Sequence, residues 1–157
     1  MELIILMLVL AAIWFYLKSR KAKSLTGYKV YGDGSFLFDI VGEASYQNNL
    51  KAIAGEKEED GKEYECVAII RAEPTNPHDS NAIAVGINNK LVGYFDRQTA
   101  KRFHTYLKNQ NLSIDAVFAV NALVVGGWDN RYSRGSYGVK LDVPLSFSDW
   151  NLERIEE

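Results

Sequence analysis

The pattern that most constrains the fold is a series of short β-prone segments separated by turn-forming residues. About six such segments can be recognised, over residues 36–42, 64–72, 82–87, 91–95, 112–125 and 137–147. Two other stretches, 46–54 and 96–109, carry apolar residues three or four positions apart, which predicts short helices. Short strands combined with two short helices predict an α+β fold built on a small, partly closed, OB-like β-barrel.

The N-terminus carries an unbroken apolar run of 15 residues, from Leu3 to Leu17. A helix of this length spans roughly 22 Å, and the snorkelling side chains of Lys18 and Arg20 extend its reach in a bilayer. The sequence therefore predicts a single-pass transmembrane helix over residues 1–18. A cleaved signal peptide and a buried soluble helix are the alternatives. Four basic residues between positions 18 and 23 predict that the rest of the chain is cytosolic.

After this anchor the sequence predicts a basic linker over residues 19–35, one domain over 36–147 and a loosely held acidic tail over 148–157. The single cysteine and two histidines argue against a disulfide framework and a structural zinc site. Neither a phosphate-binding loop nor a nucleophile–base pair is apparent. We therefore expect a non-catalytic module that needs no cofactor.

Charge limits how such a module could bind nucleic acid. From Phe36 onward the chain has 13 basic and 18 acidic residues, so its overall field does not attract phosphates. Binding of nucleic acid would have to come from a local patch. Arg97 and Lys101 lie four residues apart on the predicted helix 96–109, where its N-terminal end favours anions. A solvated helical face is the alternative interpretation.

A loop with two prolines is the most specific motif in the chain. It occupies Glu73–Val85, with the sequence EPTNPHDSNAIAV. The prolines fix the backbone on either side of Asn76, and Asp79 can hydrogen-bond to nearby backbone amides. Together with Val41–Gln47 (VGEASYQ) and Val92–Phe95 (VGYF), this loop resembles the HIRAN domain family. The resemblance extends from about residue 39 to residue 147.

The resemblance implies a pocket for the 3′-terminal nucleotide of single-stranded DNA. In such a pocket Asp79 would accept a hydrogen bond from the 3′ hydroxyl, and Asn76 would line the wall. The alternative is that the Asp79 carboxylate caps its own loop. The same resemblance implies that Tyr46 and Tyr94 form aromatic walls and that Arg97 contacts phosphate. The chain departs from family members that bind DNA ends at Ala44, Ser45 and His78, although His78 can still stack on a base.

A Gly-rich stretch over residues 126–138 places aromatic residues among arginines. These residues are Trp128, Arg131, Tyr132 and Arg134. Such a composition suits an accessory loop that stacks on unpaired bases and neutralises phosphates. It is equally typical of a tyrosine-rich contact surface for a protein partner, and the sequence leaves both interpretations open.

Overall fold

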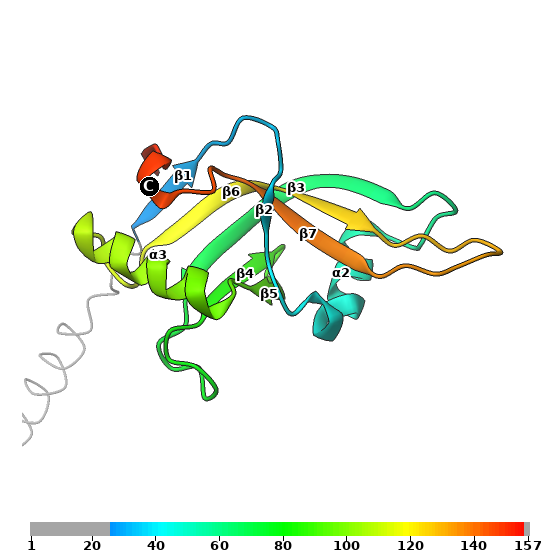
Figure 1. The fold of residues 1–157 in the computed structure, drawn as a ribbon, viewed down its shortest axis with the longest axis horizontal. Helices are drawn as coiled ribbons and strands as arrows, with labels where there is room; N and C mark the ends of the chain where they lie inside the picture. Colours follow the sequence, from blue (N-terminus) through cyan, green and yellow to red (C-terminus); the bar gives the residue numbers. More distant parts are fainter. Residues whose placement is uncertain (1–25, 156–157) are drawn as a thin grey trace, which may run out of the picture.

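The fold is organised around one curled β-sheet of eight strands, which two α-helices flank (Figure 1). The computed structural model describes residues 26–155. The strands are β1 (Gly27–Val30), β2 (Phe38–Asp39), β3 (Lys62–Ala72), β4 (Ile83–Ile87), β5 (Lys90–Tyr94), β6 (Val117–Gly126), β7 (Tyr137–Asp142) and β8 (Leu152–Ile155). The helices are η1 (Glu43–Tyr46), α2 (Gln47–Ala54), α3 (Arg97–Asn109) and η2 (Phe147–Asp149).

One extended segment, residues 38–41, closes the sheet into a partial barrel. The antiparallel strand order is β2-β7-β6-β3-β4-β5, with β1 added beside β6 and β8 beside β1. Phe38 of β2 pairs with Leu141 of β7, at one end of this order. Three residues later, the backbone of Val41 exchanges hydrogen bonds of 2.8 and 2.9 Å with Tyr94 of β5, at the other end. The predicted α+β fold with a partly closed barrel is therefore confirmed.

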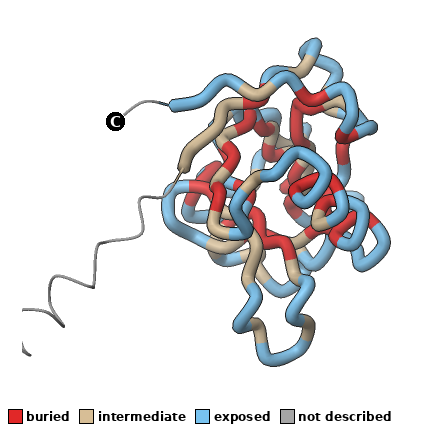
Figure 2. The backbone as a smooth tube through the Cα atoms, turned by 90° about the vertical axis from the view of Figure 1, so that its left-hand side faces the viewer, coloured by how far each residue is buried: buried red, intermediate tan, exposed pale blue. Residues whose placement is uncertain are grey.

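The barrel core is aromatic, and α3 closes one side of it. Phe103 of α3 is fully buried, and its ring lies 5.2 Å from Phe147 and 5.3 Å from Phe118, measured between centroids. Figure 2 shows most of the buried stretches of the backbone toward the middle of the domain and exposed stretches on its outer turns. Helix α3, which was predicted over residues 96–109, begins at Asp96, whose carboxylate accepts hydrogen bonds from the amides of Gln98 and Thr99 as an N-cap.

The hairpin of β4 and β5 also follows the sequence pattern. Asn88 and Asn89, which form its turn, have positive φ angles of 50° and 59°. Asparagine tolerates this conformation better than other residues with side chains, so the two residues fix the register of the hairpin.

Both ends of the described chain differ from the prediction. Strand β1 lies within the segment predicted as a linker, where it pairs in parallel with β6. The segment predicted as a loose tail contains β8, and Trp150 just before it is buried and donates a hydrogen bond to the Pro144 carbonyl. The first predicted strand, 36–42, is reduced to β2 because Ile40 and Val41 turn toward β5.

The predicted transmembrane helix lies outside the described residues, as do residues 19–25 of the predicted linker. Within residues 26–155, none of the helices combines the length and the apolar character needed to cross a bilayer.

Candidate nucleic-acid interface

The loop that connects β3 and β4 is held in shape by Asn76. Its side-chain oxygen accepts hydrogen bonds from the backbone amides of His78 (2.9 Å) and Asp79 (3.2 Å). Its amide nitrogen donates to Glu73 Oε2 at 3.1 Å. The base of the loop is closed by a backbone hydrogen bond from Glu73 to the Ala82 carbonyl. The polar atoms of the Asn76 side chain are therefore already used to build the loop.

An open hollow of about 600 Å³ lies between this loop and the end of β5. Its lining combines the guanidinium of Arg71, the carboxylate of Glu73, the rings of His78 and Tyr94, and the two prolines of the loop. A planar base could lie against such rings while polar groups contact its sugar or phosphate. The hollow therefore has the size and chemistry of a nucleotide site.

Glu73 is the carboxylate that faces this hollow. Its Oε2 accepts a hydrogen bond of 3.2 Å from the Tyr94 hydroxyl, and Arg71 approaches its Oε1 only to 3.7 Å. Burial raises the pKa of Tyr94 well above its usual range, and the adjacent Tyr46 hydroxyl and Glu73 charge raise it further. The Tyr94 hydroxyl consequently stays protonated and remains a donor. Sequence reasoning did not select Glu73, although this residue opens the double-proline motif.

Tyr46 supplies a second aromatic ring beside the hollow. It ends η1, and its ring lies against Tyr94 with centroids 6.3 Å apart and planes tilted by 52°. Gly42 introduces this helix with φ +90°, a conformation that glycine adopts readily. The structure thus brings together the predicted residues Tyr46, Asn76, His78 and Tyr94.

Asp79 is not among the residues that line the hollow. Its Oδ1 accepts a hydrogen bond of 2.8 Å from the backbone amide of Asn81, so the carboxylate caps its own loop. This arrangement is the alternative that the sequence left open for Asp79. Its role as the acceptor for a terminal hydroxyl stays a prediction.

Arg97 and Lys101 are exposed on α3 and do not line the hollow either. The helix amides expected to attract phosphate are bonded by Asp96 instead. Hydrogen bonds from Thr99 lower the pKa of the Asp96 carboxyl, which keeps it ionised near neutral pH. A phosphate at this helix end would meet the negative charge of Asp96, which opposes the predicted contribution of the helix dipole. The exposed side chains of Arg97 and Lys101 can still attract a phosphate through their own positive charge. Phosphate contact by Arg97 and Lys101 stays a prediction.

The predicted accessory loop lies at the opposite end of β3. Lys62, where β3 begins, pairs with Gly126 beside that loop, whereas Arg71, close to the end of β3, borders the hollow. Arg71 follows Lys62 by nine positions, which corresponds to roughly 30 Å in an extended strand. Figure 1 shows the β6–β7 loop and the β3–β4 loop projecting in different directions. They cannot hold the same nucleotide.

The loop between β6 and β7 is also more tightly built than its glycine content suggests. Trp128 donates a hydrogen bond to Ser133, and Arg134 pairs with Asp129 at 2.8 Å. The guanidinium of Arg131 lies over the Tyr132 ring, 4.7 Å from its centroid. Backbone hydrogen bonds join this loop to the turn with Glu58, Glu59 and Asp60. These acids oppose the positive charge that a phosphate clamp requires.

Within residues 26–155 no cluster of three or more potential ligands could hold a metal ion.

Comparison with known proteins identifies the family of this chain. No curated protein and no solved structure matches the chain significantly. The model of the HIRAN domain matches residues 34–139, which include the Gly42 turn, the double-proline loop, Tyr94 and α3. The match covers more than half of the chain, which therefore belongs to the HIRAN domain family.

Proposed function

We propose that this protein is a non-catalytic module that binds the 3′ end of single-stranded DNA in the hollow between the β3–β4 loop and Tyr94. The HIRAN domain is a nucleic-acid-binding domain, and this supports the general class of ligand. The observation that carries the proposal is the placement of a carboxylate, Glu73, beside the rings of Tyr94 and His78 in one open hollow.

A carboxylate in this position favours a hydroxyl over a phosphate at the end of the strand. Glu73 Oε2 already accepts from Tyr94, and a carboxylate oxygen can accept a further hydrogen bond from a sugar hydroxyl. A terminal phosphate at the same place would meet like charge in a partly buried site, which is unfavourable. The family resemblance assigns the hydroxyl to Asp79, whereas the geometry favours Glu73.

The full chain, purified in mild detergent, should bind a 5′-labelled oligothymidylate with a free 3′ hydroxyl about tenfold more tightly than the 3′-phosphorylated strand, a difference of roughly 1.4 kcal/mol. Glu73→Gln should abolish most of this preference because it removes the charge but keeps an acceptor for Tyr94. Asp79→Asn is the matched variant, since an asparagine can still bond the Asn81 amide. Fluorescence anisotropy at low salt measures both effects.

Three outcomes separate the alternatives. Loss of preference in Asp79→Asn alone would assign the hydroxyl to Asp79 and leave end binding intact. Equal affinities of the wild-type chain for the two ends, or no binding at low salt, would contradict the proposal. Tyr132→Ala, at the distant β6–β7 loop, should leave both affinities unchanged. A loss of affinity there would favour the accessory clamp.

The β6–β7 loop supports a second candidate function, contact with a protein partner. Tyr132 is 80% exposed at its tip, on a loop held by its own hydrogen bonds. A rigidly presented tyrosine beside acidic residues suits a protein surface better than a phosphate backbone. Cross-linking at Tyr132 that recovers no protein from cells would remove this alternative.

We further propose that residues 1–18 anchor the domain at the cytosolic face of a membrane. The support is the apolar run Leu3–Leu17 and the basic residues that follow it. In cell fractionation the chain should stay with the membranes after alkaline extraction, and its domain should be digested by protease added from the cytosolic side. Release by alkaline carbonate would exclude a spanning helix.

A further inference from the structure

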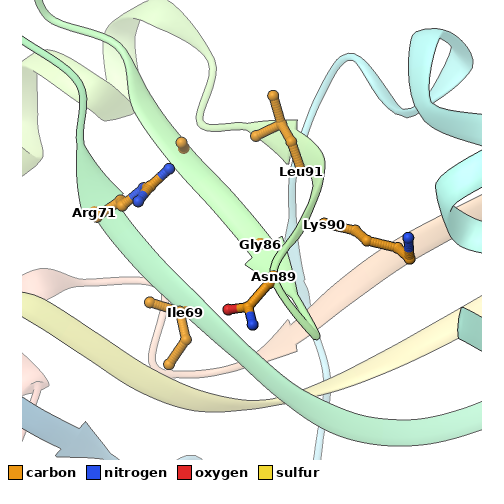
Figure 3. A pocket seen from close by; sticks show the side chains of 7 residues that line it. Ile69, Arg71, Gly86, Asn89, Lys90 and Leu91 are labelled. Carbon is orange, nitrogen blue, oxygen red and sulfur yellow. The ribbon is translucent and has the colours of Figure 1, made fainter.

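A second hollow lies beside the first one, on the outer surface of β4. The first hollow, between the β3–β4 loop and Tyr94, is the proposed end pocket. Its volume is about 220 Å³, and its lining includes Ile69 and Arg71 of β3, Gly86 of β4 and Leu91 of β5. Arg71 lines both hollows, so the two share a wall. Figure 3 shows the side chain of Arg71 pointing from β3 toward β4 and the amide of Asn89 pointing from the β4–β5 turn toward Ile69.

Strand register explains why a groove forms here. Strand β4, which lies between β3 and β5, presents only Ala84 and Gly86 on its outer face. The residues beside them on β3 and β5 have larger side chains. Arg71 and Tyr94 flank Ala84, which defines the level beside the end pocket. Ile69 and Leu91 flank Gly86 in the same way, two residues farther along the strand. The two levels are therefore roughly 7 Å apart, a step on the scale of one extended nucleotide.

The chemistry of this groove suits a nucleic-acid strand. The side chain of Arg71 is 63% exposed and is paired only loosely with Glu73, so its guanidinium can contact a phosphate. Ile69 is 38% exposed and forms an apolar wall on which a base can lie. Asn89 offers amide hydrogen bonds at the far end of the groove, where its side chain points toward Ile69. Cation, apolar wall and amide thus follow one another along β4.

We infer that the groove between β3 and β5 holds the nucleotides that precede the 3′-terminal one, so that the strand leaves the end pocket past Arg71 and runs over Gly86 toward Asn89. This inference rests on the proposed end pocket and extends it to a binding track. The occupant is single-stranded nucleic acid, because a cation and an apolar wall at successive levels match the alternation of phosphate and base.

The test compares thymidine 5′-monophosphate with a hexanucleotide of thymidine, both with free 3′ hydroxyls, on the full chain. Ile69→Glu should weaken binding of the hexanucleotide about tenfold and leave that of the mononucleotide within about twofold, because the mononucleotide occupies the end pocket and does not reach the level of Ile69. Leu145→Glu is the matched control. Leu145 is also an exposed aliphatic residue, but it lies after β7, so this variant has the same net charge and should leave both affinities unchanged.

Asn89→Gly provides an independent variant, since glycine keeps the positive φ of the turn and removes only the amide. It should weaken binding of the hexanucleotide severalfold without changing the affinity for thymidine 5′-monophosphate. Equal effects of Ile69→Glu on the two lengths, or no effect on either, would overturn the inference. Loss of discrimination between free and phosphorylated ends in the wild-type chain would instead overturn the end pocket, so the two failures can be told apart.

Discussion

Phe103→Ala should lower the free energy of unfolding by about 3–5 kcal/mol, the typical loss when a buried phenylalanine is truncated in a core that cannot collapse around the cavity. Phe103 is 0% exposed, and its ring lies 5.2 Å from Phe147, 5.6 Å from Phe95 and 5.7 Å from Trp150. Phe147 belongs to η2, Phe95 follows β5 and Trp150 lies between η2 and β8, so relaxation of one segment cannot fill the gap. Urea denaturation followed by tryptophan fluorescence measures the change.

Lys101→Ala, on the exposed side of the same helix, is the control for Phe103→Ala. It should change the free energy of unfolding by no more than about 0.5 kcal/mol. A loss below about 1.5 kcal/mol in Phe103→Ala would mean that the aromatic cluster repacks, contrary to the packing described here.

Gly93→Ala should destabilise the domain by about 2–3 kcal/mol through steric overlap at the point where the barrel closes. A Cβ at this position would lie 2.7 Å from the Ile40 side chain and 2.7 Å from the Val41 carbonyl oxygen. The backbone of Val41 cannot move away without breaking its two hydrogen bonds to Tyr94. The substitution should therefore also weaken DNA binding, because Tyr94 and Tyr46 are positioned by this junction.

The matched control is Gly138→Ala in β7, where an added Cβ meets no atom closer than 3.7 Å. This variant should be neutral or slightly stabilising, since alanine loses less conformational freedom than glycine on folding. Equal stability of the two variants in urea denaturation would show that segment 38–41 adapts to the added methyl group.

The sequence predicted those parts of the fold that local pattern determines. Alternation in β3, the Asn88-Asn89 turn and the capped helix after Asp96 each depend on residues close together in the chain. Strands β1 and β8 were not predicted because each has only four residues. Strand β1 pairs with β6, more than 80 residues away, and β8 pairs with β1. Neither carries an alternation long enough to be recognised.

The candidate site was predicted in part for the same reason. The double-proline motif correctly located the loop, and Tyr46, Asn76, His78 and Tyr94 lie together there. The sequence could not distinguish which carboxylate faces the hollow. Asp79 is held by the Asn81 amide two residues away, whereas Glu73 is oriented by Tyr94, 21 residues away on another strand. Likewise, only the β3–β6 register reveals that the β6–β7 loop is remote from the pocket.

The pairing of β2 with β7 has a consequence for synthesis of the protein. Phe38 contacts Leu141, and Gly27 of β1 lies opposite Ile155 of β8. The early strands therefore cannot pair until β6, the first partner of β1, and β7, the partner of β2, have emerged from the ribosome. Contacts between residues so distant in sequence also slow folding, because a long loop must close before they form. The barrel should therefore stay open in the nascent chain until β7 has been translated.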